Sequence, residues 1–492
     1  MEFKLKTIPE KKNTDVIIKD STIFTDDQEY AIKHILEFIS SPFNPANYII
    51  GLVGKGGTGK TFIVNYIIKH CIYSPSVITC TSPTHKACRI FSQAIENKNV
   101  DTIQSTFGFR LNVNIENFDP NNPAFAPVGQ VKLDVTKLLI IDEASMLPAS
   151  LVTYICKICK TKEIKILFLG DDHQLFPVNE AKSNAFARCS KIYTLNQIVR
   201  QDSTNPIINI LNIIRDDIDN KTHNFISYIV NHIGYELYND NNEGFSIVNS
   251  IDFKNYVDIY FHDKEYTKNI DMYRIVAYTN NSIIKWNNYI RNSIIKDADK
   301  NIITKNDLLM SYNTIVDEYG SVIINNSEEY IVKDIVDYID PSYNFKGFYI
   351  RFQQVHGGII TRPLFIINHK DIPSIKRYYD VANELITSAK TCVNKSERIR
   401  KWKAYYTFKR SYLLLTNIVD KHGKVQHSRD IDYAFAISAH KSQGSTYDNV
   451  FVDLNDMIYD KNGKLYTNQQ DLLRRIYVAC SRTRKKLIIG YK

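Results

Sequence analysis

The chain has 492 residues, of which 44% are hydrophobic and 23% are charged, a composition typical of a folded protein of about two to four domains. This composition excludes a disordered chain, and the lack of any apolar run of about 20 residues excludes a membrane-spanning helix. The formal net charge of +9 suits a polyanionic partner without proving one.

The first predicted site follows the apolar run at residues 48–50. The segment GKGGTGKT, from Gly54 to Thr61, has the spacing of a phosphate-binding loop, in which backbone N–H groups and a helix start face the phosphates. Lys60 is predicted to reach the β- and γ-phosphates, and the Thr61 hydroxyl to bind Mg²⁺. We therefore predict ATP and Mg²⁺ as cofactors, held by Gly54, Gly56, Gly57, Thr58, Gly59, Lys60 and Thr61.

Short apolar runs recur along the chain, and each ends in polar residues. Residues 77–80 lead into TSPTHKA, residues 138–141 into DEASML, and residues 166–169 into GDDHQLFPV. Apolar strands that alternate with helices predict an α/β fold with a parallel sheet, whose ligands gather at the carboxyl ends of the strands. Here Asp142 is predicted to bind Mg²⁺, Glu143 to take a proton from the attacking water, and Gln174 to sense the γ-phosphate.

The alternation of strand and polar cluster restarts late in the chain. Residues 275–277 lead into YTNNS, residues 433–437 into SAHKSQGSTYD, and residues 450–452 into Asp453. A helix-like stretch near the end, LLRRIYVACSRTRKKL, carries Arg482. Two sheets with one phosphate-binding loop predict a nucleotide held between two lobes, the second of which supplies arginines to the phosphoryl transition state.

Two further segments do not fit either sheet. Residues 107–135 contain the turn sequence DPNNP flanked by alternating residues, which predicts a β-hairpin. Residues 300–425 contain the strand-like segments NDLLMSYN, EEYIVKDIV and GFYIRFQQV, which predict a small β-barrel, followed by basic helices with interleaved aromatic residues. These helices can form a nucleic-acid surface or a solvated arm with its aromatic residues packed inward, and the pattern favours the arm.

In their order along the chain, these motifs resemble those of superfamily 1 DNA helicases, specifically the RecD-like branch that includes the Dda-type enzymes. The resemblance rests on GKGGTGKT, TSPTHKA, DTIQSTFG, DEAS, GDDHQLFPV, LNQIVRQ, AHKSQGSTYD and YVACSRTR. It implies two RecA-like lobes, with the hairpin inserted in the first and an SH3-like β-barrel plus a helical arm in the second. The implied division is residues 1–200 for the first lobe, 201–299 and 426–492 for the second, and 300–425 for the barrel and arm.

The resemblance also implies roles for individual residues. Gln28 in FTDDQ would read adenine, Gly444 would contact the nucleotide, and Arg200 and Arg482 would act as two arginine fingers. The implied DNA contacts are Thr81, Pro83, Thr84, His85, Thr102, Ser105, Tyr278, Thr279, Asn280, Ser438 and His440. Threonine and serine at such positions can instead cap helices.

Two further expectations concern the nucleic-acid contacts, namely the residue that separates the strands and the residue at position 104. In Dda-type enzymes the hairpin splits the duplex, which would make Phe118 or Phe125 the wedge. Gln104 departs from the histidine that is usual in the family, and this puts one DNA contact in question.

The resemblance implies an ATP-dependent DNA helicase that moves 5′ to 3′ on single-stranded DNA and unwinds the duplex. ATP would close the cleft between the lobes and hydrolysis would open it. A superfamily 1 RNA helicase and an ATP-switched single-strand-binding protein that does not unwind stay open as alternatives. Expected partners are single-stranded DNA and duplex junctions. A single-strand-binding protein or a replisome component is a further candidate partner. We expect a monomer in the cytoplasm, the host's if a phage encodes it.

Overall fold

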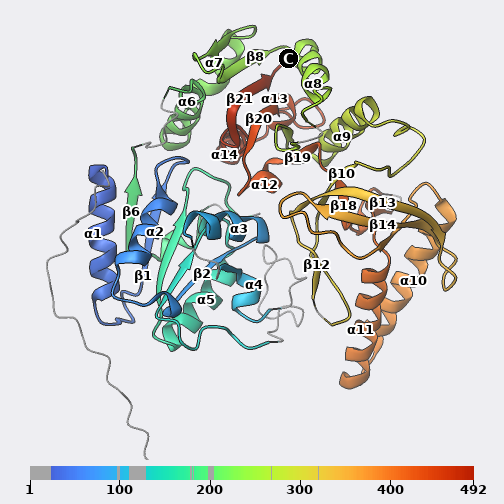
Figure 1. Cartoon of the computed structure of the whole chain (residues 1–492), viewed down its shortest axis with the longest axis horizontal. Coiled ribbons are helices and arrows are strands. Elements are labelled where there is room, and N and C mark those ends of the chain that lie inside the picture. Colours follow the sequence, from blue (N-terminus) through green and yellow to red (C-terminus); the bar gives the residue numbers. More distant parts are fainter. Residues whose placement is uncertain are drawn as a thin grey trace, which may run out of the picture.

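The structure is a computed structural model, and it describes residues 24–96, 100–109, 129–177, 180, 182–197, 204–266, 269–319, 321–420 and 422–492. Within these residues it contains two mainly parallel six-stranded sheets and one five-stranded antiparallel sheet (Figure 1). In the same ranges, the structure has no helix with the length and apolar character needed to cross a membrane.

The first lobe is built on a fully parallel sheet of strand order β3-β2-β4-β5-β1-β6. Its strands are β1 (Ile49–Gly54), β2 (Ile78–Ser82), β3 (Val100–Thr102), β4 (Leu138–Ile141), β5 (Lys165–Gly170) and β6 (Lys191–Leu195). The helices are α1 (Asp26–Ser40), α2 (Lys60–His70), α3 (His85–Ala94), α4 (Ile103–Thr106) and α5 (Ala149–Thr161).

Packing on both faces explains why these strands are continuously apolar. Ile50 and Leu52 of β1 join one hydrophobic core, whereas Ile49 and Val53 join the core on the opposite face. Successive side chains of a strand point to opposite faces, so a sheet covered by helices on both sides needs apolar residues at every position.

The second lobe has a sheet of strand order β19-β9-β20-β21-β8-β7, parallel except for β7 at one edge. Its strands are β7 (Glu236–Tyr238), β8 (Gly244–Val248), β9 (Tyr273–Ala277), β19 (Ala436–Ser438), β20 (Tyr447–Asp453) and β21 (Thr483–Gly490). Its helices are α6 (Ile207–Asn220), α7 (Asn224–Asn231), α8 (Ser250–Phe261), α9 (Asn280–Ile294), α12 (Ala439–Ser442), α13 (Leu454–Ile458) and α14 (Gln469–Cys480). The predicted second parallel sheet is therefore confirmed.

Two details of the predicted second lobe are wrong. The apolar run at residues 433–437 is not one strand, because β18 ends at Tyr433 in the antiparallel sheet and β19 begins at Ala436 in the parallel one. The chain crosses between the two sheets at this point. The last helix ends at Cys480, so Arg482 lies in the turn before β21 rather than on the helix.

An antiparallel sheet and two helices, here called the insert, interrupt the second lobe. The sheet has the order β15-β14-β13-β10-β18, with β10 (Leu308–Ser311), β13 (Glu329–Ile339), β14 (Lys346–Gln354), β15 (Leu364–Ile367) and β18 (Ile431–Tyr433). Two short pairs accompany it: β11 (Ile315–Val316) with β12 (Val322–Ile324), and β16 (Ile418–Val419) with β17 (Val425–His427). Helices α10 (Ile372–Thr391) and α11 (Lys395–Ser411) pack together and project from the sheet as an arm (Figure 1).

Both lobes and the insert meet at a buried ion-pair cluster, here called the three-way joint, formed by Lys86, Arg274, Glu329 and Tyr447. Glu329, the first residue of β13, pairs with Lys86 of α3 at 3.0 Å and with Arg274 of β9 at 3.1 Å. The Tyr447 hydroxyl donates to the same carboxylate at 3.1 Å. Burial opposes ionisation, but Lys86 and Arg274 lower the pKa of Glu329 to about 2. The charges are therefore satisfied only while the three parts stay in contact.

Candidate nucleotide site and nucleic-acid groove

The phosphate-binding loop connects the end of β1 to the start of α2. Gly57 and Gly59 have φ of 87° and 84°, in the left-handed region that favours glycine. A side chain at position 59 would also meet the Gln28 amide nitrogen at 2.8 Å. Glycine at these two positions therefore lets the loop turn tightly before Lys60 begins α2.

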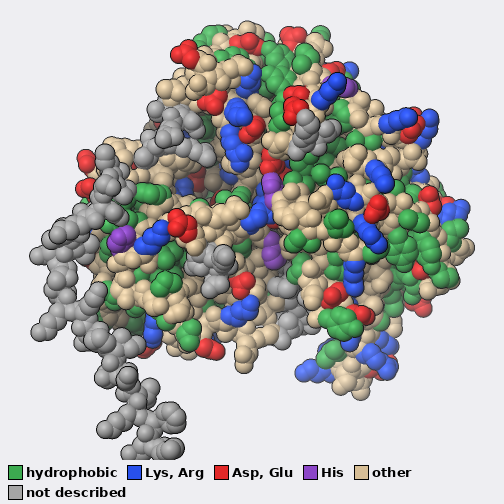
Figure 2. All heavy atoms as spheres, viewed as in Figure 1, with side chains coloured by type: hydrophobic (Ala, Val, Ile, Leu, Met, Phe, Trp, Pro, Cys, Tyr) green, Lys and Arg blue, Asp and Glu red, His purple; other side chains and the backbone are tan. Residues whose placement is uncertain are grey.

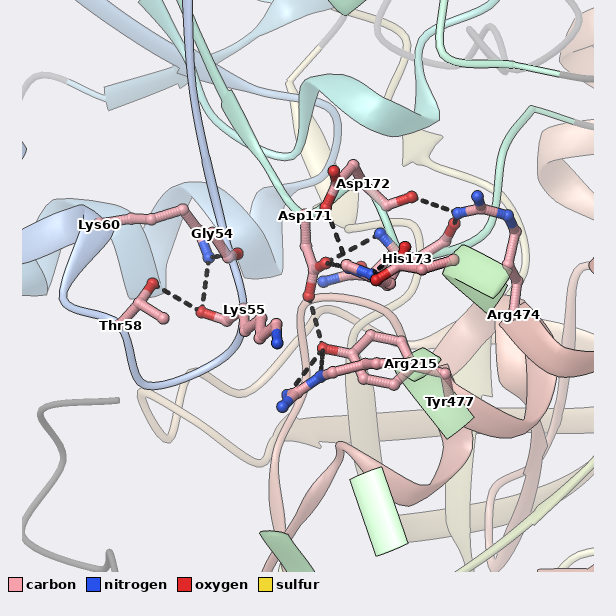
Figure 3. Close-up of polar contacts among 12 residues, drawn as sticks. Gly54, Lys55, Thr58, Lys60, Asp171, Asp172, His173, Arg215, Arg474 and Tyr477 are labelled. Atoms are coloured by element: carbon pink, nitrogen blue, oxygen red, sulfur yellow. Dashed lines mark hydrogen bonds and ion pairs between the residues drawn. The ribbon is translucent and has the colours of Figure 1, made fainter. Parts of the chain in front are cut away.

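The Lys60 ammonium group lies folded against this loop. Its Nζ donates to the carbonyl of Gly54 and, at 3.1 Å, to that of Lys55, while Thr58 Oγ1 donates to Lys55 at 2.9 Å (Figure 3). Neutral carbonyls are weaker partners for an ammonium group than phosphate oxygens are. The loop thus holds a cation where a nucleotide's phosphates can attract it, and its residues fit a nucleoside triphosphate.

A cavity of about 600 Å³ lies beside the loop and has walls from both lobes. Eleven of the predicted residues line it: Gln28, Gly56, Gly57, Gly59, Lys60, Thr61, Asp142, Glu143, Gln174, Gly444 and Arg482. Arg200 lies outside the described residues. Asp171, Thr446 and Ser481 also line the cavity. They lie within the motifs GDDHQLFPV, AHKSQGSTYD and YVACSRTR, but sequence analysis gave them no role.

Asp142 and Glu143 follow β4 and sit together in the cavity wall. Burial, and then the neighbouring Glu143 carboxylate, raise the pKa of Asp142 to about 7. Burial also raises the pKa of Glu143, against the opposing charges of Arg482 and Lys60. Two buried carboxylates that resist ionising together favour a bound cation, so Asp142 with the Thr61 hydroxyl fits Mg²⁺.

Two buried oxygens in the cavity wall are free to accept hydrogen bonds. Glu143 Oε2 and Gln174 Oε1 have no hydrogen-bond partner among the described residues. Both residues line the cavity. Buried acceptors are costly when unsatisfied, so a water molecule or ligand group in the cavity would be held by them.

The Gln28 amide is already hydrogen-bonded within the protein at both its oxygen and its nitrogen. Its Oε1 accepts from the Thr25 backbone at 3.1 Å, and its Nε2 donates to the Thr58 carbonyl at 3.0 Å. The side chain therefore completes the capping box of α1 and ties that helix to the phosphate-binding loop. Its role in reading adenine stays a prediction.

A polar cluster that sequence analysis did not anticipate joins the two lobes beside the cavity, which its member Asp171 also lines. It is here called the clasp. Its members are Asp171, Asp172 and His173 after β5, Arg215 and Asp219 of α6, and Arg474 and Tyr477 of α14. Figure 3 labels all of them except Asp219. Tyr477 donates to Asp171 at 2.8 Å, and Arg215 donates to the Tyr477 hydroxyl at 3.1 Å. The motif GDDHQLFPV contains the first three residues, but nothing in it showed their partners, which lie 46 positions away in α6 and about 300 positions away in α14.

His173 lies at the centre of the clasp. Its Nε2 is 3.0 Å from Asp219 of the second lobe, and its Nδ1 is 3.0 Å from Asp172. Burial opposes protonation, but the contacts with Asp171, Asp172 and Asp219 raise the pKa of His173 to about 10. The imidazolium therefore carries a positive charge between carboxylates of both lobes at neutral pH.

A second cavity, of about 220 Å³, forms a groove between the first lobe, the second lobe and the insert. It brings together four of the predicted DNA contacts, Pro83, Thr84, Ser438 and His440. Tyr312 and Ser327 of the insert and Lys441 also line it and were missed by sequence analysis. Glu143 and Gly444 line both this groove and the nucleotide cavity.

Several predicted DNA contacts are helix caps in the structure. Thr84, Thr102, Thr279 and Ser438 accept hydrogen bonds from the first turns of α3, α4, α9 and α12. Each cap lies at the carboxyl end of a strand or within two residues after it. The Thr279 hydroxyl donates its proton to Asp456. A capping hydroxyl otherwise keeps its own proton, so Thr84, Thr102 and Ser438 can still donate to a phosphate beside a helix N-terminus.

Apart from Pro83, Thr84, Ser438 and His440, the predicted DNA contacts do not line the groove. Thr81 is fully buried and accepts from Thr106 at 3.4 Å, and Ser105 accepts from Lys132 at 2.9 Å. His85 begins α3, Tyr278 lies 3.6 Å from the Arg475 guanidinium, and Asn280 accepts from Arg429 at 3.0 Å. Phe118 and Phe125, with most of the predicted hairpin, lie outside the described residues.

Comparison with known proteins agrees with this geometry. Residues 24–227 match the family described as an AAA domain, and residues 433–489 match that described as a UvrD-like helicase C-terminal domain. Together these segments make up about half of the chain and hold the residues of both cavities except for Tyr312 and Ser327.

Three relatives are similar over long stretches. The uncharacterized protein R530 of Acanthamoeba polyphaga mimivirus is 23% identical over 94% of this chain and 99% of its own length. The RecBCD enzyme subunit RecD of Buchnera aphidicola is 24% identical over 93% of this chain and 72% of its own length. The ATP-dependent DNA helicase dda of Enterobacteria phage T4 is 24% identical over 62% of this chain and 66% of its own length. The matched segments and these relatives together support a superfamily 1 helicase of the RecD and Dda type.

Proposed function

We propose that this protein is an ATP-dependent DNA helicase that moves along single-stranded DNA and unwinds duplex DNA. The observation that carries the proposal is the shared wall of the two cavities, because Glu143 and Gly444 border both the nucleotide cavity and the groove. A strand in the groove would contact the same segments that surround the γ-phosphate. The named activity of the dda relative supports the choice of DNA.

The chemistry of the nucleotide cavity supports ATP hydrolysis. Lys60 would bind the β- and γ-phosphates, while Glu143 Oε2 and Gln174 Oε1 would accept the protons of the attacking water. Mg²⁺ held by Thr61 and Asp142 would neutralise charge that develops on the phosphates. Arg482 reaches the cavity from the second lobe, so it can stabilise the transition state only when the lobes are together.

Several finer assignments belong to the same proposal. We propose 5′ to 3′ movement, Arg200 as the other arginine finger, Phe118 or Phe125 as the strand-separating wedge, and an SH3-like form for the insert sheet. The lobe boundaries given from the sequence, a monomeric state and contact with a single-strand-binding protein or replisome component are proposed with them. Support for each comes from the motif resemblance.

ATP turnover with and without nucleic acid tests the proposed function. Turnover is measured with no nucleic acid, with oligo-dT and with oligo-U. Strong stimulation by oligo-dT alone is the expected result, and 5′- and 3′-tailed duplexes then report the polarity. Equal stimulation by oligo-U would favour an RNA helicase, and turnover indifferent to both would contradict the proposal.

A further inference from the structure

Helix α11 of the arm carries far more positive than negative charge. Its 17 residues include seven lysines and arginines and one acidic residue, Glu397. Glu397 pairs with Lys401 at 3.3 Å, and Arg410 donates to the Asp317 carbonyl at 3.1 Å. Four basic side chains, Lys395, Arg398, Arg400 and Lys403, are exposed and have no acidic partner among the described residues. They are here called the basic face.

Some aromatic residues of the arm are buried away from this surface. Phe408 and Tyr378 are buried and pack with Phe345 and Phe365 in the core between the arm and the insert sheet. Trp402, Tyr405 and Tyr406 are only partly buried, so the structure leaves both forms considered from the sequence open. The four cations of the basic face are exposed, and Lys and Arg side chains gather at the free end of the arm (Figure 2).

The basic face is electrostatically unfavourable in the free protein. Lys395 and Arg398 lie in the first turn of α11, where the helix dipole is positive and acidic residues are preferred. Lys395 with Arg398, and Arg400 with Lys403, are like-charge pairs three residues apart, a spacing that destabilises a helix. A polyanion would remove both penalties when it binds.

We propose that the basic face binds the phosphate backbone of duplex DNA next to the single-strand junction, as a site separate from the groove. From Lys395 to Lys403 the helix spans about 12 Å, along which a duplex presents about seven phosphates. The arm projects from the side of the insert (Figure 1), and the residues that line the groove include none from α10 or α11. A stiff helix suits the evenly spaced charges of a duplex.

The three-way joint strengthens this assignment. Because Glu329 of the insert is paired with Lys86 of the first lobe, the base of the arm has a fixed position relative to the residues that line the groove. A duplex held by the arm would therefore keep a constant position relative to the strand that the motor pulls. The proposal rests on the proposed DNA-helicase activity.

A neutralised variant tests the basic face. K395Q/R398Q/R400Q/K403Q should bind a forked DNA about tenfold or more weakly than the wild type at low salt. The slope of log affinity against log salt should fall in magnitude by about 3 to 4, since each lost phosphate contact removes about 0.9. Turnover stimulated by an oligo-dT of about eight nucleotides should be unchanged, because such a strand occupies the groove alone.

The matched control is K33Q/K157Q/K160Q/K296Q, which removes four exposed lysines from α1, α5 and the segment after α9. It has the same net charge as the test variant and should bind the fork like the wild type. Equal loss in both variants would overturn the proposal in favour of diffuse charge. Unchanged fork binding, or an equal loss of short-strand stimulation, in the test variant would overturn it too. A wild type that nucleic acid does not stimulate would instead overturn the proposed function.

Discussion

At the scale of single residues, Lys60 is the residue whose removal should affect ATP turnover most. Lys60→Ala removes the ammonium group that contacts the carbonyls of Gly54 and Lys55 and would contact the phosphates. We expect ATP turnover to be lost while binding of single-stranded DNA persists, since Lys60 does not line the groove. Turnover and DNA affinity are measured on the same preparations. Lys69→Ala, a change at an exposed lysine of the same helix, is the control and should leave turnover normal.

Arg482 is the test of catalysis across the lobes. It is buried in the cavity wall, where its Nε donates to the Val478 carbonyl at 3.1 Å. In Arg482→Ala we expect kcat for ATP to fall by about 10³ with little change in KM, the pattern of an interaction made in the transition state. Arg484→Ala changes an exposed neighbour paired with Asp448 and should retain the wild-type kcat. A normal kcat in Arg482→Ala would remove it as a finger.

At the scale of elements, the three-way joint should dominate the attachment of the insert. Glu329→Gln leaves Lys86 and Arg274 buried without their counter-charge, which costs about 3–5 kcal/mol when one partner of a buried pair is removed. Urea unfolding should show a much lower midpoint than for the wild type. Asp334→Asn, in the same strand, breaks a pair with Lys305 in which both side chains are more than half exposed, and it should cost far less. Equal midpoints for the two variants would contradict the assigned role of the joint.

The sequence predicted those parts of the elements that depend on local spacing. The loop from Gly54 to Thr61 and the pair Asp142–Glu143 each lie within one strand-to-helix connection, so periodicity and motif were enough to place them. The joint could not be predicted, because Lys86 and Glu329 are 243 residues apart and neither sits in a pattern that names its partner. The split at Tyr433 was missed for a similar reason, since one apolar run serves two different sheets.

At the scale of the whole molecule, the clasp should make the contact between the lobes depend on pH. The pKa of His173 is raised to about 10 from its ordinary value of 6.5, so its stabilising contribution is complete below about pH 6.5 and is lost as pH rises through about 10. The difference in unfolding free energy between wild type and His173→Gln should therefore shrink from pH 6 to pH 10. Denaturant titrations at each pH measure it. A difference that is constant or grows over this range would show that the imidazolium is not what holds the lobes.

The wall that Glu143 and Gly444 share has a thermodynamic consequence. If a bound strand changes the affinity for ATP by some factor, a bound ATP analogue must change the affinity for the strand by the same factor, because both paths around the cycle end in one ternary complex. Two titrations with a non-hydrolysable analogue would give the same number from opposite directions. Multiplying RT by the logarithm of this factor gives the coupling free energy, which is available to link each turnover to a step along the strand.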